Sequence, residues 1–258
     1  MLAVLSPAKK LNFNNSSLSA KGTDPLFATQ ANELVSILRK LDYHNMKALF
    51  PISEKLIQLN MDRYKKFECN PKEDSVELAV HAFAGDTYVG LDAGSFTEND
   101  IKFADRSLRI ISGLYGLLKP TDSIQPYRLE MGTKLRNKNG DDLYAFWKNY
   151  IAKEVNKILL QHKDKTVINL ASTEYFSAID QTQIDTRILN TEFLEEKDGV
   201  LKVISFFAKK ARGAMANFIV KNKIENVAEL QEFKLSGYSF RSELSNSDKF
   251  VYSRKSEK

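Results

Sequence analysis

The sequence predicts an α/β protein in which a central mixed sheet is surrounded by helices, built as a single compact domain over residues 1–258. Two short apolar segments, 1–5 and 166–172, are each followed at once by polar residues, which is typical of buried strands. The segments between them show the three-to-four-residue spacing of amphipathic helices. A chain of 258 residues with 43% hydrophobic content is long enough to bury one large core.

Composition excludes several classes of protein. No run approaches the ~18 apolar residues of a membrane span, and MLAVLSPAKK is too short an apolar stretch for a signal peptide, so we expect a cytoplasmic location and no membrane contact. The single cysteine, Cys69, excludes an internal disulfide and a cysteine-rich metal site. Lys and Arg outnumber Asp and Glu by 38 to 33, which favours a polyanionic partner only if the charges gather on one surface.

The first predicted strand, residues 1–5, is followed by SPAKK. Ser6, Lys9 and Lys10 therefore stand at its carboxyl end, where open α/β sheets usually bind ligands. A capped turn with solvated lysines is the alternative. Residues 11–25 are rich in Asn, Ser and Gly and predict a long loop.

Residues 26–64 predict two or three short helices. Apolar residues recur at spacings of four and three, and residues 42–45 and Pro51 interrupt the pattern. Two helices joined by a short turn are a shape used by DNA-binding modules, and also an ordinary packing unit.

The next segment, 75–94, is an apolar run that enters a glycine-rich turn, and it predicts a strand or a buried helix. His81 lies inside this run, as expected of a core histidine. Ser95 precedes Glu98 by three residues, the pattern of a capping box. The helix that follows is predicted to place four apolar residues on one face: Ile101, Ala104, Leu108 and Ile111.

The stretch 112–135, SGLYGLLKPTDSIQPYRLEMGTKL, combines glycines, prolines, aromatic and charged residues more densely than an ordinary connection. It predicts either a buried, tightly turned loop or a site loop. Within it, Gly113 to Gly116 predicts either a hairpin between two helices or a purely structural turn, and the part that contains Arg128 and Glu130 is the stronger candidate for function.

Beyond Gly140, a long helix is predicted to bury Tyr144, Trp147, Ile151, Val155 and Ile158. The strand at 166–172 then places further polar residues at its carboxyl end. If the two buried strands are neighbours, one cleft collects residues from both ends of the chain: Ser6, Lys9, Asn169, Ser172 and Glu174.

The alternating residues 187–207 predict a β-hairpin with a type I′-like turn at 197–199, whose second strand includes VISFF. A helix follows with Lys209, Lys210 and Arg212 near its start, where positive charge opposes the helix dipole. A bound anion would relieve that conflict. Residues near 239 and 250 predict a final antiparallel pair, with a frayed tail from Ser253.

The motifs support few common chemistries. The three histidines show no metal-ligand spacing, and no P-loop, dinucleotide fingerprint or G-x-S-x-G elbow occurs, so we expect no metal site and no cofactor. If the protein is an enzyme, the candidate catalytic residues are Ser6, Lys9, Tyr127, Glu130 and Glu174. Arg128 and Glu130 equally suit a structural ion pair.

Taken together, these motifs resemble the YaaA peroxide-stress proteins, known from bacteria. The matching segments, in family order, are SPAKK with Leu11, GDTYVGL, the whole of 112–135, DLYAFW, INLASTEYF and ISFFAKKARGAMANFI. The resemblance implies an α/β fold with a positively charged cleft and a helix-hairpin-helix element. It also implies binding of double-stranded DNA with little sequence preference, and a role in limiting oxidative damage and free iron during hydrogen peroxide stress.

The chain departs from this family pattern in two places, with Asn217 where a basic residue is common and Lys10 where Thr is usual. The helix-hairpin-helix element has two candidates, the hairpin at Gly113 to Gly116 and the helices between Leu34 and Tyr64.

Our leading hypothesis is a DNA-binding protein that is a binder and not an enzyme, with one positive cleft lined by Lys9, Lys119, Arg128, Lys209, Lys210 and Arg212. The rival is an enzyme acting on nucleic acid, by base excision or a glycosylase-like reaction, or on a phosphorylated small molecule. Direct iron sequestration lacks a visible cluster of ligands.

Overall fold

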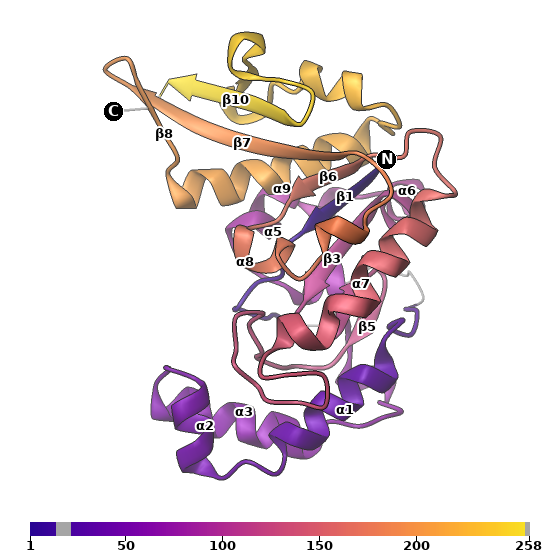
Figure 1. Cartoon of the computed structure of the whole chain (residues 1–258), viewed down its shortest axis with the longest axis vertical. Coiled ribbons are helices and arrows are strands. Elements are labelled where there is room, and N and C mark those ends of the chain that lie inside the picture. Colours follow the sequence, from indigo (N-terminus) through magenta and orange to yellow (C-terminus); the bar gives the residue numbers. More distant parts are fainter. Residues whose placement is uncertain (14–21, 256–258) are drawn as a thin grey trace.

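The computed structural model describes residues 1–13 and 22–255; part of the loop predicted at 11–25 therefore lies outside the described residues. Within them an eight-stranded mixed sheet forms the centre of the molecule (Figure 1). Its order is β4 (Gly116–Leu118), β3 (Leu108–Ser112), β1 (Leu2–Leu5), β6 (Val167–Leu170), β7 (Ile188–Lys197), β10 (Lys249–Lys255) and β9 (Ser239–Phe240), with β8 (Val200–Lys202) paired to β7. The predicted fold class, a mixed sheet among helices, is confirmed.

Strand β1 lies at the centre of a parallel array. It pairs in parallel with β3 on one side and β6 on the other, and Leu5 stands opposite both Ile110 and Leu170. All four of its residues are fully buried, as expected for an apolar run covered on both faces of a parallel sheet. The strands expected at 1–5 and 166–172 are therefore neighbours, which is the condition under which their polar ends were expected to share one cleft.

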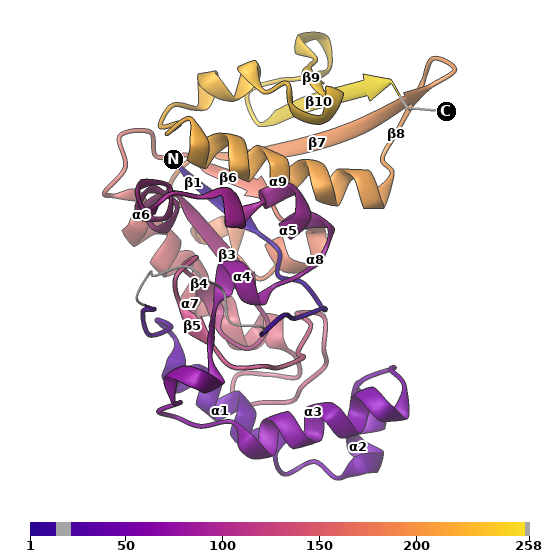
Figure 2. The same cartoon turned by 180° about the vertical axis from the view of Figure 1, so that it is seen from behind.

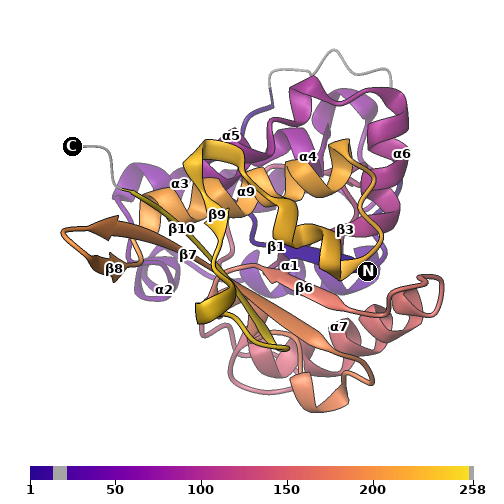
Figure 3. The same ribbon diagram turned by 90° about the horizontal axis from the view of Figure 1, so that it is seen from above.

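Helices cover both faces of the sheet (Figures 2 and 3). Helix α7 (Leu143–Leu159) lies on one face, and α5 (Asp86–Leu91), α6 (Glu98–Ser107) and α9 (Ser205–Lys221) lie on the other. Helix α7 buries the predicted stripe from Trp147 to Ile158, whereas Tyr144 is only half-buried and donates its hydroxyl to the carbonyl of Glu174.

A helical lobe extends beyond the sheet. It consists of α1 (Ala28–Leu38), α2 (Tyr43–Leu49) and α3 (Glu54–Lys66), and it confirms the prediction of short helices over 26–64. Between this lobe and the sheet, β2 (Glu77–Leu78) pairs with β5 (Ser123–Ile124), and the short helix α4 (Ala79–Ala82) follows β2. The other short helix, α8 (Thr173–Phe176), directly follows β6.

Two expectations about the middle of the chain are wrong. Helix α6 ends at Ser107 instead of continuing through Leu108 and Ile111, because Leu108–Ser112 forms strand β3 beside β1. Gly113 to Gly116 consequently joins β3 to the antiparallel β4 and does not join two helices. A buried parallel strand carries no alternation of apolar and polar residues, so its pattern is easily taken for a buried helix.

Smaller corrections concern the ends of elements. The capping box of α6 is formed by Thr97 and Asp100, not by Ser95 and Glu98. The VISFF segment is not one strand, since β8 ends at Lys202 and α9 begins at Ser205. Strand β10 continues to Lys255, so the tail is not frayed from Ser253, whose side chain is buried. The hairpin turn is confirmed: Asp198 and Gly199 both have positive φ, as a type I′ turn requires.

Candidate nucleic-acid interface

The first part of the central stretch is a buried scaffold. The hydroxyl of Ser112 accepts the backbone amides of Leu114 and Tyr115 at 3.2 and 2.9 Å and lies 2.7 Å from the hydroxyl of Tyr127. Trp147 donates its indole N–H to the carbonyl of Gly113 at 2.9 Å. These bonds fix the backbone that precedes Arg128 and Glu130, whose side chains are partly exposed.

Tyr127 belongs to this scaffold. Its side chain is buried, and burial raises the pKa of its hydroxyl well above the ordinary value. As the hydroxyl is already bonded to Ser112, Tyr127 acts as a support for the neighbouring loop.

Arg128, Glu130 and Lys9 form an ion-pair cluster. The guanidinium of Arg128 donates to Glu130 Oε1 at 2.7 Å, and Lys9 Nζ lies 3.5 Å from the same oxygen. The Arg128 and Glu130 side chains are 16% and 17% exposed, whereas that of Lys9 is 65% exposed. The Nε atom of Arg128 is buried without a hydrogen-bond partner among the described residues, and the hydroxyl of Tyr64 donates to the Arg128 carbonyl. Arg128 therefore retains donor capacity that Glu130 does not use.

The ends of β1 and β6 meet, as predicted from their polar residues. Ser6 Oγ accepts the amide of Ser172 at 2.8 Å, and the two hydroxyl oxygens are 3.3 Å apart. Glu174, at the start of α8, accepts the amide of Gly132 at 3.1 Å, which ties this edge to the central stretch. The side chain of Asn169, within β6, instead donates to Asn190 and accepts the amide of Ala171.

A hollow of about 770 Å³, here named the charged hollow, lies between these residues and the helical lobe. One wall is polar, with Lys9, Arg128, Glu130, Lys134, Arg136 and Glu174. The opposite wall is apolar, with Ile37, Leu41, Leu49, Phe50, Pro51 and Ile52. Its volume is that of a site for a small molecule or a single nucleotide. Lys134 and Arg136 were not predicted as site residues, although the segment TKLR at 133–136 contains two basic residues that could have indicated them.

Lys119 lies elsewhere. It lines a separate hollow of about 570 Å³ together with Arg106 and Arg109, at the end of α6. Arg109 is buried there and donates to the carbonyls of Asp105 and Leu108, which satisfies the end of that helix. The structure thus brings Lys9 and Arg128 together but does not place Lys119 with them.

Lys209, Lys210 and Arg212 form a second group of cations, named the α9 basic cluster. Both lysines are exposed, Arg212 is half-buried, and burial lowers the pKa of Arg212. None of the three has a hydrogen bond or ion pair to a described residue through its side chain. A half-buried guanidinium without a counter-charge is costly, and an anion bound beside it would offset that cost.

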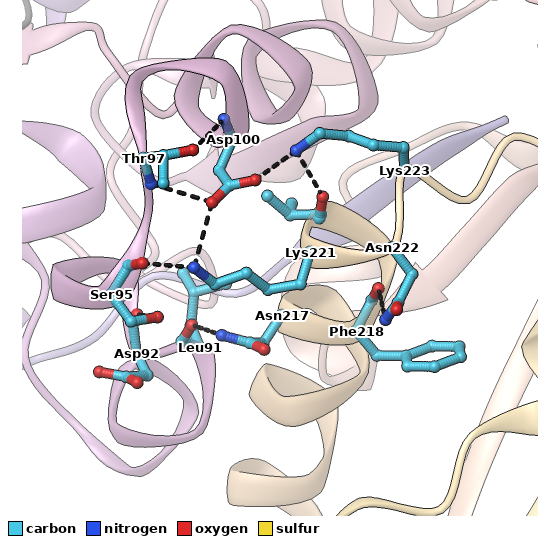
Figure 4. Close-up of polar contacts among 11 residues, drawn as sticks. Leu91, Asp92, Ser95, Thr97, Asp100, Asn217, Phe218, Lys221, Asn222 and Lys223 are labelled. Carbon is cyan, nitrogen blue, oxygen red and sulfur yellow. Dashed lines mark hydrogen bonds and ion pairs between the residues drawn. The ribbon is translucent and has the colours of Figure 1, made fainter.

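The basic residues at the end of α9 and just beyond it, Lys221 and Lys223, have a different role (Figure 4). Lys221 donates to Asp100 Oδ2 at 3.1 Å and Lys223 donates to Oδ1, so both tie α9 to the start of α6. The hydrogen bond from Lys223, with those from Thr97 and Lys221, holds the pKa of Asp100 well below its ordinary value. Asn217 donates to the carbonyl of Leu91 at 2.8 Å, at the end of α5. This stretch of α9 is structural.

Two general findings limit the chemistry. Among the residues described, no three His, Cys, Asp or Glu side chains are grouped so as to hold a metal ion. No helix in the described part of the chain has the length and apolar character needed to cross a membrane.

The fold and the site define a mixed α/β protein with a charged hollow beside the carboxyl ends of its central parallel strands and, on α9, a group of three cations without ion pairs to described residues. The chain matches the family model described as peroxide stress protein YaaA over residues 1–244, and it belongs to this family.

Proposed function

We propose that this protein binds double-stranded DNA with little sequence preference, through phosphate contacts, and in this way limits iron-driven damage during hydrogen peroxide stress. The observation that carries the proposal is the α9 basic cluster, three cations without acidic partners in the described structure. Lys9 and Arg128, beside the charged hollow, supply further positive charge. Phosphate contacts of this kind confer affinity without sequence preference.

The shape of the chain supports the same proposal. The β7–β8 hairpin with the start of α9 projects on the same side of the molecule as α2 and α3, with α8 between the two ends (Figures 1 and 2). A rod-like polyanion would lie along this side. We further propose α2 and α3, joined by the short connection 50–53, as the helix-hairpin-helix element, since the rival segment at Gly113 joins strands.

The test is duplex binding measured over a salt series with the Lys209→Ala, Lys210→Ala, Arg212→Ala triple variant. Loss of three phosphate contacts should weaken binding and lower the slope of log K against log salt by about 2.7. The matched control removes three exposed lysines on α6, α7 and the connection to β6: Lys102, Lys153 and Lys165. Equal affinity of the α9 variant and wild type would refute the proposed contact surface.

The link to iron is tested separately. Plasmid nicking by ferrous iron and peroxide should decrease when wild-type protein coats the DNA and should return to its full extent with the α9 triple variant. If equilibrium dialysis showed uptake of ferrous iron instead, protection would have to be assigned to the metal and not to DNA coverage.

A second candidate function is an enzyme acting on nucleic acid or on a phosphorylated small molecule in the charged hollow. The observation in its favour is the enclosed pairing of Arg128 with Glu130 beside Lys9 and Glu174, which is more elaborate than non-specific binding requires. Damaged and bubble-containing duplexes, followed by a strand-cleavage assay, test it with Glu130→Gln as the matched variant. Cleavage by wild type that is lost in this variant would establish the enzyme; binding without turnover would favour the simple binder.

A further inference from the structure

An exposed apolar patch lies beside the α9 basic cluster. Within seven residues, Val200, Val203, Ile204 and Phe206 have exposed fractions of 52%, 53%, 40% and 54%. Isolated exposed apolar residues are normal, but a contiguous group marks a contact surface. The patch covers β8, its connection to α9 and the first turn of α9.

The chain that carries the patch bears positive charge only, while Glu195 and Glu196 on the paired strand β7 stand opposite Lys202 and Leu201 and form ion pairs with Arg254 and Arg241. Residues 199–224 contain no Asp or Glu, and exposed Lys202, Lys209 and Lys210 flank the apolar side chains. The occupant must therefore combine negative charge with apolar surface. Nucleic acid does so, since phosphates border the flat faces of the bases.

The base of the patch is rigid. The ring of Phe206 contacts that of Phe207 with centroids 5.3 Å apart, and Arg254 lies 4.7 Å from the Phe207 ring. Arg254 in turn donates to the buried carboxylate of Glu195 at 2.8 Å. Phe207 is thus supported by Arg254, and the contact between the two rings restricts Phe206, which reduces the entropy lost when it enters a partner.

From these features we infer that Phe206, supported by Val203 and Ile204, is a wedge that inserts between base pairs of the bound duplex and bends it. The inference rests on the proposed DNA binding and adds a mode of contact to it. Apolar side chains flanked by cations unstack a base step in this way, and a two-stranded β-ribbon such as β7–β8 has dimensions that fit a DNA groove. The β7–β8 hairpin and the start of α9 project on the same side of the molecule as α2 and α3 (Figure 1), which favours a rod that reaches both ends over a flat lipid surface.

The experiment uses the full chain and a short duplex carrying end-to-end fluorophores and a central 2-aminopurine. Wild type should shorten the end-to-end distance and raise the 2-aminopurine fluorescence. Phe206→Ala should abolish both signals while duplex affinity falls by no more than about tenfold, because phosphate contacts remain. The matched control is Leu160→Ala, at an apolar residue that is 72% exposed at the end of α7; it should behave as wild type.

A second variant reports directly on stacking between the side chain at position 206 and the bases. Phe206→Trp adds an exposed indole to a chain whose one native tryptophan is buried, and stacking on bases should quench its emission. If wild type binds duplex in a salt-dependent manner but produces no bend, and Phe206→Ala binds equally well, the wedge is refuted and the proposed function stands. If wild type binds no duplex but binds anionic phosphatidylglycerol vesicles through Phe206, both the wedge and the DNA proposal are refuted.

Discussion

Asp122 shows how the central stretch is held at the level of single residues. Its side chain is buried, and it accepts the hydroxyl of Thr23 at 2.7 Å and the backbone amide of Lys119 at 2.8 Å. Burial raises the pKa of the carboxyl to about 6, and these hydrogen bonds offset only part of that shift. The carboxyl joins the segment at residue 23 to the loop that precedes β5.

This buried carboxyl predicts a pH-dependent stability. Because the native pKa lies above the unfolded value, the stabilisation it provides is full below about pH 4 and is lost as pH rises through about 6. The free energy of unfolding of wild type, minus that of Asp122→Asn, should therefore fall by roughly 3 kcal/mol between pH 4 and pH 8. Urea titrations at several pH values measure it. If the free energy of unfolding changed with pH in the same way in both proteins, the ionisation assigned to Asp122 would be contradicted.

At the scale of elements, two glycines determine how α9 packs on α5. A Cβ atom at Gly213 would lie 1.8 Å from the carbonyl oxygen of Thr87, and one at Gly90 would lie 2.0 Å from that of Lys210. The helix backbones approach too closely for any side chain at these positions. The position of the α9 basic cluster depends on this contact.

Gly213→Ala is therefore expected to destabilise the protein by about 3 kcal/mol, since backbone atoms on both helices must move apart. The control is Gly94→Ala, where a Cβ meets no atom within 4 Å, so the change should stay within about 1 kcal/mol. Thermal and urea unfolding of both variants provide the comparison. A Gly213→Ala variant as stable as the control would mean that the two helices separate easily.

Elements with a local signal were predictable and those defined by distant partners were not. The turn at Asp198 and Gly199 depends on its own two residues, and α7 has a long apolar stripe, so both followed from the sequence. Strand β3 was missed because its apolar run fits a helix as well as a strand until its pairing with β1 is known. The start of α9 at Ser205 was missed for a related reason: VISFF has high strand propensity, which the packing of α9 overrides.

The candidate site was predictable to the extent that strand order determines it. The adjacency of Ser6 and Ser172 followed from treating two buried strands as neighbours, and the structure confirms it. The separation of Lys119 from Arg128 did not follow, because the eight residues between them pass through the buried scaffold, so that the two side chains line different hollows. Residues that are close in sequence can lie at different sites where the backbone between them turns inside the core.

At the scale of the whole molecule, the two projecting ends predict a contact with one duplex at two places. Helix α3 carries three exposed lysines without ion pairs among the described residues: Lys55, Lys65 and Lys66. If both ends contact the same DNA, replacing these three with Ala should lower the salt slope by about 2.7, as for the α9 triple variant.

Combining the two sets tests this arrangement further. The loss of binding free energy in the six-residue variant should equal the sum of the losses in the two triple variants, because groups on α3 and α9 share no partners. Salt titrations of the wild type, both triple variants, the six-residue variant and the Lys102, Lys153, Lys165 control provide the measurement. Should the α3 variant bind as wild type does, the duplex would contact α9 and its hairpin alone, and α2 and α3 would be packing elements and not a helix-hairpin-helix module.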